Sequence, residues 1–331
     1  DVAKMAGVST TTVSRVLNQK PDVKEDTKRL ILEIIKNNDY YPSALAKGTS
    51  INKSHTLGLV ITDDRIFVNP FFVEVLRGIN HAAAAAGYFA LLCTAESNND
   101  SPVSIFKQKR VDGIILISPR LSQNPIEELI KEKVPFISTS KITGIAGLNY
   151  VDVDNFLGAK LAVEHLVMLG HKRIGLIGGP SNLASSYDRK KAFCDTLKLN
   201  GLKIHEELMV EGDHSSESGY SCMEKLLAVD ELPTSVFIAG DIMAFGAMQH
   251  LKQKNILVPR DMSIVGFDDV PLTKLVDPPL TTVRQFPFRK GFTAANHLIN
   301  MLKGYSGTPV KELLPVELII RQSAAAPKPV Y

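Results

Sequence analysis

The sequence predicts an α/β protein built from a small three-helix unit at the amino terminus and a larger body of parallel sheets. Short helical segments joined by the tight turn Ala6-Gly7-Val8 occupy the first 41 residues. From residue 57 onward, apolar strand-like runs alternate with helical segments. Because a single doubly wound sheet holds about six strands and the chain has more such runs, we expect the body to have two lobes.

The second helix of the amino-terminal unit is expected to begin at Ser9, whose hydroxyl can accept an unpaired amide of the following turn. Val13, Val16 and Leu17 recur at helical spacing and predict one buried stripe. The polar residues Thr10, Thr11, Ser14 and Arg15 lie off this stripe. Two helices joined by a tight turn, the second with an exposed polar face, indicate a helix-turn-helix that enters the DNA major groove. A small helical bundle with solvated polar faces is the alternative.

The charge distribution agrees with contact to nucleic acid. Residues 1–56 contain nine Lys or Arg and six Asp or Glu, so the whole formal excess of +3 lies in this part of the chain. A local positive excess favours phosphate contact, although an excess of this size is weak support taken alone.

In the body, apolar runs predict strands at 57–62, 89–93, 113–118, 135–139, 173–178, 235–240 and 263–267. Helices are predicted between them at Phe72–Ala86, Gly158–Leu169, Asp188–Asn200, Ser218–Leu227 and Ile242–Gln253. Strands that are apolar along their whole length are typical of parallel sheets covered by helices on both faces.

The composition excludes several classes of protein. No apolar run reaches the roughly 18 residues that a membrane-spanning helix needs. The amino end carries Lys4 and polar residues rather than an apolar leader, so secretion is not expected. Cys93, Cys194 and Cys222 lack metal-ligand spacing and are expected to be free thiols in a cytoplasmic protein.

Catalytic chemistry is not expected. The turn Gly178-Gly179-Pro180 follows a strand but lacks the glycine order of a dinucleotide loop and the ending of a phosphate loop. The pairs Asp63-Asp64 and Asp268-Asp269 have no nearby histidine or further carboxylate that would complete a metal or acid–base site. No serine lies in a nucleophile elbow. We therefore predict no catalytic residue, no metal and no cofactor.

A binding cleft fits these residues better, because ligands of open α/β sheets lie beyond the carboxyl ends of the strands. Residues expected at these ends are Phe71, Phe72, Arg189, Asp241 and Asp268. Aromatic faces with carboxylates and one arginine suit a polyhydroxylated or heterocyclic small molecule. In the alternative interpretation the two phenylalanines belong to the core and Asp241 only caps the following helix.

Several long segments in register resemble the LacI/GalR family of bacterial transcription regulators. DVAKMAGVSTTTVSRVLN is similar to the DNA-reading signature of the family, YYPSALAK to its hinge and VDVDNFLGAKLAVEHLVMLGHKRIGLIGGP to its central segment, followed by AGDIMAFGAM, IVGFDD and PPLTTVRQ. The resemblance implies a periplasmic-binding-protein-like body whose two doubly wound lobes are joined by three crossovers, near residues 156, 284 and 312. It also implies a homodimer on a palindromic operator.

The resemblance implies a headpiece at 1–41, a hinge helix and linker at 42–56 and an effector-binding and dimerisation body at 57–331. Lobe 1 would comprise about 57–155 and 285–311, and lobe 2 about 156–284 and 312–323. The DNA-binding residues carried over are Ser9, Thr10, Thr11, Thr12, Ser14, Arg15, Asn18, Leu45, Ala46 and Thr49. The effector-binding residues carried over are Phe71, Phe72, Arg189, Phe237, Asp241 and Asp268.

The chain departs from the family pattern at three places. The segment 96–113 is short for a full βα unit, Thr49 replaces the usual hinge leucine, and Leu183 stands where the purine repressor has an arginine. The last departure favours a sugar effector. The carboxyl-terminal SAAAPKPVY has no apolar heptads, so a dimer rather than a tetramer is expected.

We therefore expect a cytoplasmic, nucleoid-associated repressor that responds to a sugar. The alternatives are a catabolite regulator activated by a phosphorylated phosphocarrier protein, a purine-responsive repressor, and a solute-binding module. The last leaves the first 56 residues without a role.

Overall fold

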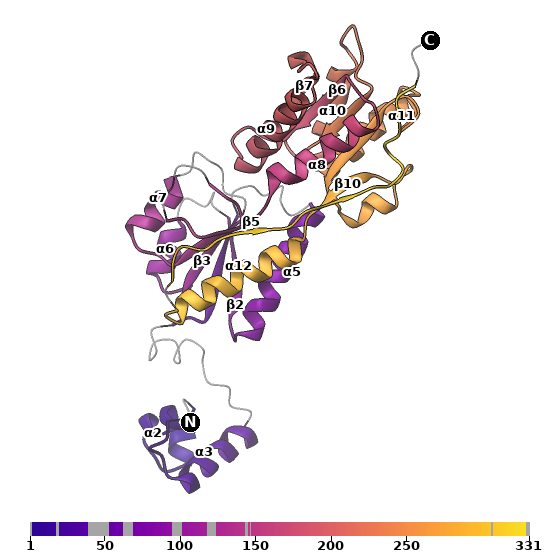
Figure 1. Cartoon of the computed structure of the whole chain (residues 1–331). Helices are drawn as coiled ribbons and strands as arrows, with labels where there is room; N and C mark the ends of the chain where they lie inside the picture. The colour runs from indigo at the N-terminus through magenta and orange to yellow at the C-terminus, as the bar shows by residue number, and fades with distance from the viewer. Residues whose placement is uncertain are drawn as a thin grey trace. The chain divides into compact units, whose positions relative to one another are not determined.

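The computed structural model describes residues 2–17, 20–38, 53–61, 69–94, 101–117, 124–142, 145, 147–305 and 307–328. The chain divides into two compact units, Asp1–Ser54 and His55–Tyr331, each with its own core (Figure 1). We call them the headpiece and the body.

The headpiece has the three predicted helices, α1 (Val2–Met5), α2 (Thr10–Leu17) and α3 (Glu25–Asn37). Its small core consists of the buried residues Val2, Ala3, Val13, Val16 and Ile31. Gly7 forms the turn between α1 and α2 at φ +65°, a conformation that costs glycine nothing. Ser9 begins α2 as predicted, because its Oγ accepts from the Thr12 amide at 3.1 Å.

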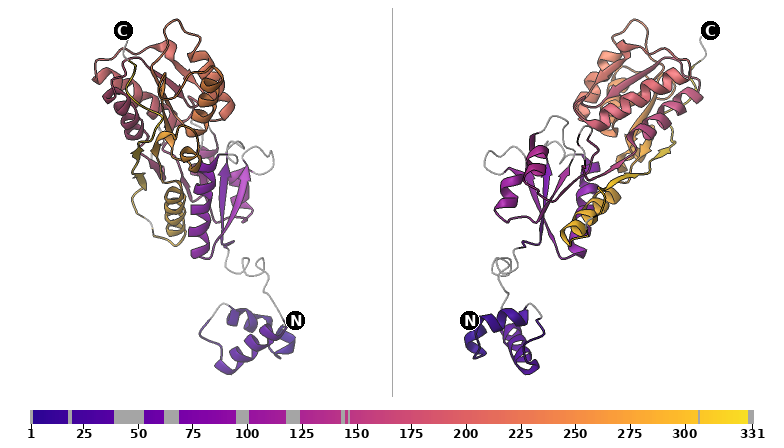
Figure 2. Two further views of the ribbon diagram at one scale, coloured as in Figure 1. Left: turned by 90° about the vertical axis from the view of Figure 1, so that its right-hand side faces the viewer. Right: turned by 60° about the vertical axis from the view of Figure 1, so that its left-hand side comes forward.

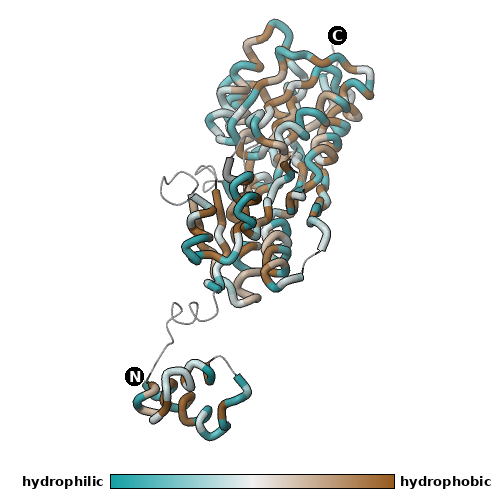
Figure 3. The backbone as a smooth tube through the Cα atoms, turned by 90° about the vertical axis from the view of Figure 1, so that its left-hand side faces the viewer, coloured by the Kyte–Doolittle hydropathy of each residue, from teal (hydrophilic) through white to brown (hydrophobic). Residues whose placement is uncertain are grey.

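Lobe 1 of the body contains a six-stranded parallel sheet in the order β2-β1-β3-β4-β5-β11. Its strands are β1 (Thr56–Ile61), β2 (Phe89–Thr94), β3 (Gly113–Ile117), β4 (Phe136–Ser138), β5 (Tyr150–Val153) and β11 (Lys311–Leu314). Its helices are α5 (Pro70–Ala85), α6 (Pro102–Lys107), α7 (Asn124–Lys131) and α12 (Pro287–Leu302). The central strands β1 and β3 are buried almost throughout, which explains why their sequences are continuously apolar (Figure 3).

Lobe 2 repeats this topology in the order β7-β6-β8-β9-β10-β12, with the last pair antiparallel. Its strands are β6 (Ile174–Gly178), β7 (Met209–Glu211), β8 (Ser235–Ile238), β9 (Ser263–Asp268), β10 (Thr281–Arg284) and β12 (Glu317–Ile319). Its helices are α8 (Asn155–Met168), α9 (Ala184–Leu199), α10 (Ser216–Leu226) and α11 (Asp241–Gln253), with 3₁₀ turns η2 (Glu206–Leu208) and η3 (Pro271–Lys274). Figure 2 shows both lobes with helices on either side of the strands.

The chain passes between the lobes after β5, after β10 and after β11. The first two passages lie close to the expected positions. The third lies a little later than residue 312, because β11 pairs with β5 through Leu314 and residues 312–314 therefore belong to lobe 1 rather than lobe 2.

Each lobe has two helices that approach closely at a reciprocal pair of glycines. In lobe 1 a Cβ on Gly78 would lie 2.0 Å from the Phe288 carbonyl oxygen, and one on Gly291 would lie 2.0 Å from the Val75 carbonyl oxygen. In lobe 2, α10 and α11 cross in the same way. A Cβ on Gly219 would lie against the backbone of Met243, and one on Gly246 against the backbone of Ser216. Because backbone lies against backbone, a side chain has no room at any of these crossings.

We expect Gly246→Ala to destabilise the body by about 1–3 kcal/mol or more, since overpacking of this size forces the helices apart. A Cβ on Gly246 would lie 1.8 Å from the Ser216 carbonyl oxygen, whereas one on Gly307 would meet nothing within 4 Å. Gly307→Ala is therefore the control. Chemical denaturation followed by circular dichroism measures both, and equal stability of the two variants would contradict the crossing as a constraint.

Candidate functional site

A polar cavity of about 950 Å³ opens between the two lobes of the body, at the carboxyl ends of the parallel strands. Lobe 1 contributes Phe71, Phe72, Ile117, Ser140, Asp152 and Lys290 to its lining. Lobe 2 contributes Leu183, Ser185, Arg189, Asp268 and the loop Glu211–Ser218. Asn155 and Gln285, which follow the first two passages between the lobes, complete the wall.

The aromatic part of the cavity wall comes from the first turn of α5. Asn69 caps this helix, since its side chain accepts from the Phe71 amide at 3.0 Å. Phe71 is buried and meets the half-buried Phe72 edge to face, with ring centroids 5.2 Å apart. The cap therefore fixes where α5 begins, and with it the position of the two rings at the cavity. Both residues lie at the site that the sequence predicts.

Arg189 on α9 lines the lobe 2 side and is 7% exposed. Its Nε donates to Asn155 Oδ1 at 2.9 Å and its Nη1 donates to the Ala239 carbonyl oxygen at 2.8 Å. The guanidinium lies 3.6 Å from the centroid of the Phe267 ring. Burial lowers the pKa of Arg189, and nearby Asp268 opposes this effect. The side chain is thus held rigidly, with N–H groups beyond these two bonds available to a ligand.

Asp268, the last residue of β9, has a strained backbone with φ +125°. Its Oδ1 accepts from Gln285 Nε2 at 2.6 Å. Burial raises the pKa of the Asp268 carboxyl to about 6, against the opposing charge of Arg189. Strain together with a desolvated carboxylate in a cleft indicates a functional residue.

Two of the residues predicted to bind the effector, Phe237 and Asp241, are buried and do not line the cavity. Phe237 is fully buried in β8 and contacts Phe267 inside lobe 2. Asp241 is also fully buried, where its carboxylate accepts from Thr282 Oγ1 at 2.6 Å and from the Val270 amide at 3.0 Å. Burial raises the pKa of Asp241 well above its usual value. Asp241 therefore connects strands behind the cavity instead of binding in it.

The sequence analysis missed an ion pair on the lobe 1 wall. Lys290 Nζ lies 2.8 Å from Asp152 Oδ1, and the two side chains are 7% and 2% exposed. Asp152 lies on β5 and Lys290 on α12, two elements that the apolar pattern did not reveal. A lysine in the first turn of an otherwise amphipathic helix is the only sequence signal, and it does not distinguish a buried side chain from an exposed one.

In the headpiece, α2 presents the predicted polar face. Ser9, Thr10, Thr11 and Arg15 are exposed, and Thr12 and Ser14 are half-buried. Arg15 Nη2 lies 2.7 Å from Asp22 Oδ2. Asn18, Leu45, Ala46 and Thr49 lie outside the described residues. On α3, Leu30 is 45% exposed, whereas the neighbouring Ile31 is buried in the headpiece core.

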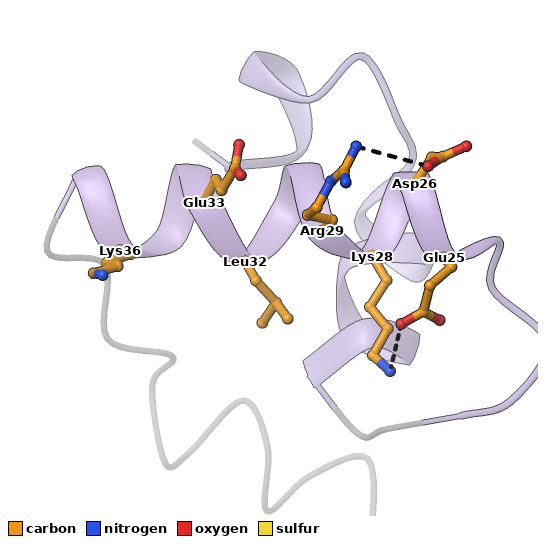
Figure 4. A pocket seen from close by; sticks show the side chains of 7 residues that line it. All are labelled: Glu25, Asp26, Lys28, Arg29, Leu32, Glu33 and Lys36. Carbon is orange, nitrogen blue, oxygen red and sulfur yellow. Dashed lines mark hydrogen bonds and ion pairs between the residues drawn. The ribbon is translucent and has the colours of Figure 1, made fainter.

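A shallow hollow on α3 is not a binding site comparable to the cavity (Figure 4). Lys28 pairs with Glu25 at 3.4 Å and Arg29 with Asp26 at 3.8 Å, both one turn apart along the helix. Exposed pairs of this kind are typical of a solvated helix face.

Within the described ranges, no group of three or more His, Cys, Asp or Glu residues is arranged to hold a metal ion. None of the described helices is both long and apolar enough to cross a membrane.

Comparison with known proteins agrees with both units. Residues 1–43 match the lacI family of bacterial regulatory proteins, and residues 163–324 match a periplasmic-binding-protein-like domain. The chain is 34% identical to the HTH-type transcriptional repressor PurR of Haemophilus influenzae strain PittEE, over 98% of this chain and 97% of that protein.

Solved structures give the same result. A lac repressor dimer bound to operator and the anti-inducer ONPF is 28% identical, with a TM-score of 0.88 and 98% of both chains covered. The transcriptional regulator CelR in complex with cellobiose is also 28% identical, with a TM-score of 0.78 and 98% of both chains covered. An α/β body of two parallel-sheet lobes behind a helix-turn-helix headpiece, matched along almost its whole length, places this chain in the LacI family of DNA-binding transcriptional regulators.

Proposed function

We propose that the protein is a repressor that binds a palindromic operator as a homodimer and is controlled by a sugar in the interlobe cavity. The observation that carries the effector assignment is the set of rigid polar groups facing this cavity, with Arg189 and Asp268 on one side and Phe72 on the other. Residues 1–41 would read the DNA, 42–56 would form the hinge, and 57–331 would bind the effector and the second subunit.

A sugar fits this lining because its hydroxyls both donate and accept hydrogen bonds, while its ring carbons lie against an aromatic face. Asp268 supplies a carboxylate acceptor, and Arg189 supplies guanidinium donors. The structural similarity to CelR, described in complex with cellobiose, supports a carbohydrate.

A purine is the second candidate, favoured by the similarity to PurR repressors. His214 lines the cavity with φ +68°, and Gly179 gives it space, because a Cβ there would lie 2.5 Å from the imidazole ring. A base could lie between His214 and Phe72. Against this candidate, Leu183 lines the cavity with an aliphatic side chain where the resemblance to the purine repressor would require an arginine.

Operator selection from random duplexes, followed by titration of the complex with sugars and with hypoxanthine, tests the proposal. An effector that binds the cavity must change operator affinity, and the operator must change effector affinity by the same factor. Absence of a selected operator would refute the repressor assignment. Release or tightening by hypoxanthine, with no response to any sugar, would replace the sugar by the purine.

The apolar edge of lobe 1 supports the homodimer. Phe89 and Leu91 on the edge strand β2 are 75% and 37% exposed. They point to the same face of the sheet as Cys93, which packs with the core under α6 and α7. Since α6 has only six residues, it covers little of β2. An uncovered apolar edge strand is a site for pairing with another chain, and a second copy would bury it.

We expect Leu91→Glu to shift the protein from dimer to monomer, because a charge would be buried in the subunit interface. Sedimentation velocity over a range of protein concentrations measures the shift. Leu199→Glu, which changes an isolated leucine that is 77% exposed on α9, is the control and should remain dimeric. An unchanged dimer in Leu91→Glu would exclude β2 from the interface.

We expect Arg15→Ala to reduce discrimination between operator and random DNA, since a bidentate arginine–guanine contact is worth about 1–3 kcal/mol. Arg29→Ala, on the solvated face of α3, should affect both duplexes alike and alter mainly the salt dependence. Fluorescence anisotropy with the selected operator and a shuffled duplex measures both variants. Equal losses on the two duplexes for Arg15→Ala would contradict its role in base reading.

We expect Asp268→Asn to stabilise the free protein at pH 8 by an amount on the order of 1 kcal/mol, while weakening sugar binding. The raised pKa, about 6, means that ionisation of Asp268 costs the folded state stability as pH rises through this value. The advantage of the variant should therefore disappear toward about pH 4. Asp269→Asn should destabilise instead, because ion pairs with Arg284 and Arg321 stabilise that carboxylate. Thermal denaturation against pH measures both, and equal pH profiles of wild type and Asp268→Asn would contradict the argument.

A further inference from the structure

We propose that the cavity selects an uncharged, unphosphorylated sugar, and that the ion pair between Lys290 and Asp152 determines this selectivity. Lys290 would donate hydrogen bonds to the ligand while Asp152 cancels its charge. This inference rests on the proposed sugar-binding function and adds the charge class of the ligand.

The bonding of the pair assigns the two partners different roles. Asp152 Oδ1 accepts from the Val153 amide at 2.8 Å and from Lys290 Nζ at 2.8 Å, and Asp152 Oδ2 accepts from the Lys141 amide at 2.9 Å. The protein itself therefore uses most of the acceptor capacity of this carboxylate. An ammonium group has three donors, and the bond to Asp152 uses one of those of Lys290. Lys290 is therefore the member of the pair that can bind a ligand. Because its side chain is buried and lines the cavity, a ligand that accepts from it would lie in the cavity.

The ammonium group also lies beside the aromatic wall, with Nζ 5.8 Å from the centroid of the Phe71 ring. A sugar hydroxyl or ring oxygen that accepts from Lys290 would therefore lie next to Phe71 and Phe72. On the opposite wall the same ligand would meet Arg189 and Asp268. The ligand would thus connect lobe 1 to lobe 2 through Lys290, which is ion-paired, and through Arg189 and Asp268, which are held by hydrogen bonds to neutral groups.

The charges of the cavity disfavour an anionic ligand. Among the described residues, Lys290 and Arg189 are the only Lys or Arg side chains in the lining, and they face Asp152 and Asp268. The loop after β7 adds the carboxylates Glu211, Asp213 and Glu217 to the same lining. A phosphate group would bring up to two further negative charges into a site with no unbalanced lysine or arginine. Like charges in a partly desolvated cleft repel strongly.

The ion pair also predicts how the selectivity can be changed. Asp152→Asn keeps one acceptor oxygen, enough for one of the two backbone amides that bond to different carboxylate oxygens, and removes the charge that balances Lys290. The cavity would then hold one unbalanced cation at the position of the ligand. Binding of a phosphorylated sugar should improve relative to its neutral counterpart, whereas Lys290→Met should weaken the neutral sugar without this gain.

Isothermal titration of the full chain tests these expectations with cellobiose, glucose and ribose as neutral probes and glucose 6-phosphate and ribose 5-phosphate as charged probes. Wild type should bind at least one neutral probe and prefer it to a charged one. Lys290→Met should bind that probe roughly tenfold more weakly, as expected for loss of a hydrogen bond to a charged donor. Asp152→Asn should shift the ratio of charged to neutral affinity by roughly tenfold toward the charged probe.

Lys160→Met on α8 is the matched control, since Lys160 is exposed and pairs only with Glu164 on the same helix in the described structure. It should bind like wild type. If Lys290→Met does not fold by circular dichroism, Lys290→Gln replaces it, because glutamine keeps a donor of similar length without the charge. Lys290→Gln should retain more affinity for the neutral probe than Lys290→Ala.

Preference of wild type for a phosphorylated probe, or unchanged affinity in both Lys290→Met and Asp152→Asn, would overturn the inference and leave sugar binding intact. Failure of wild type to bind any of the sugars would overturn the proposed function, and the inference with it.

Discussion

The body depends on one buried carboxylate that joins the start of the second passage between the lobes to the segment after β12. Asp269, next to the cavity residue Asp268, accepts from Arg284 Nε at 2.7 Å and from Arg321 Nη2 at 2.6 Å. Arg284 ends β10 and Arg321 follows β12, so these bonds tie the start of the second passage and the segment after β12 to the end of β9. Although burial opposes ionisation, the two arginines hold the pKa of Asp269 below its usual range. Removal of either partner would leave a buried charge unpaired.

This arrangement gives a ligand a direct route to the hinge between the lobes. Asp268 holds Gln285, the residue that follows Arg284, so adjacent carboxylates bind adjacent residues of the second passage. A ligand hydroxyl that donates to Asp268 competes with Gln285 for that carboxylate. Under the proposed function, occupancy of the cavity would therefore act on the backbone of the second passage between the lobes. Such a two-state element, biased by a ligand at one place and by DNA at another, is what allosteric coupling requires.

The sequence predicted the strands that are apolar along their whole length and missed those whose short runs are interrupted by polar residues. The runs at 57–62, 113–118 and 263–267 correspond to central strands covered on both faces, and their apolar pattern follows directly from that position. The strands β5, β7, β10, β11 and β12 were missed, because they are short and several carry charges toward the edges of the sheets. Of the residues carried over for the effector, Phe71, Phe72, Arg189 and Asp268 line the cavity. The position of a residue at the end of a strand does not determine whether its side chain points into the cavity or into the core behind it. Phe237 and Asp241 were therefore expected in the cavity, although both are buried behind it.

The shared topology of the lobes explains why each buried cation of the cavity has a carboxylate in its own lobe. Both sheets end toward the same space, so each lobe must bring polar side chains to a site where water is partly excluded. A single charge there would carry a large desolvation cost, which a partner in the same lobe reduces before any ligand arrives. Lobe 1 does this with Lys290 and Asp152, held in one ion pair. In lobe 2, Asp268 opposes the desolvation of Arg189 across the cavity wall. Because each of these two cations is offset by a carboxylate of its own lobe, a change in the angle between the lobes would not separate either cation from that carboxylate.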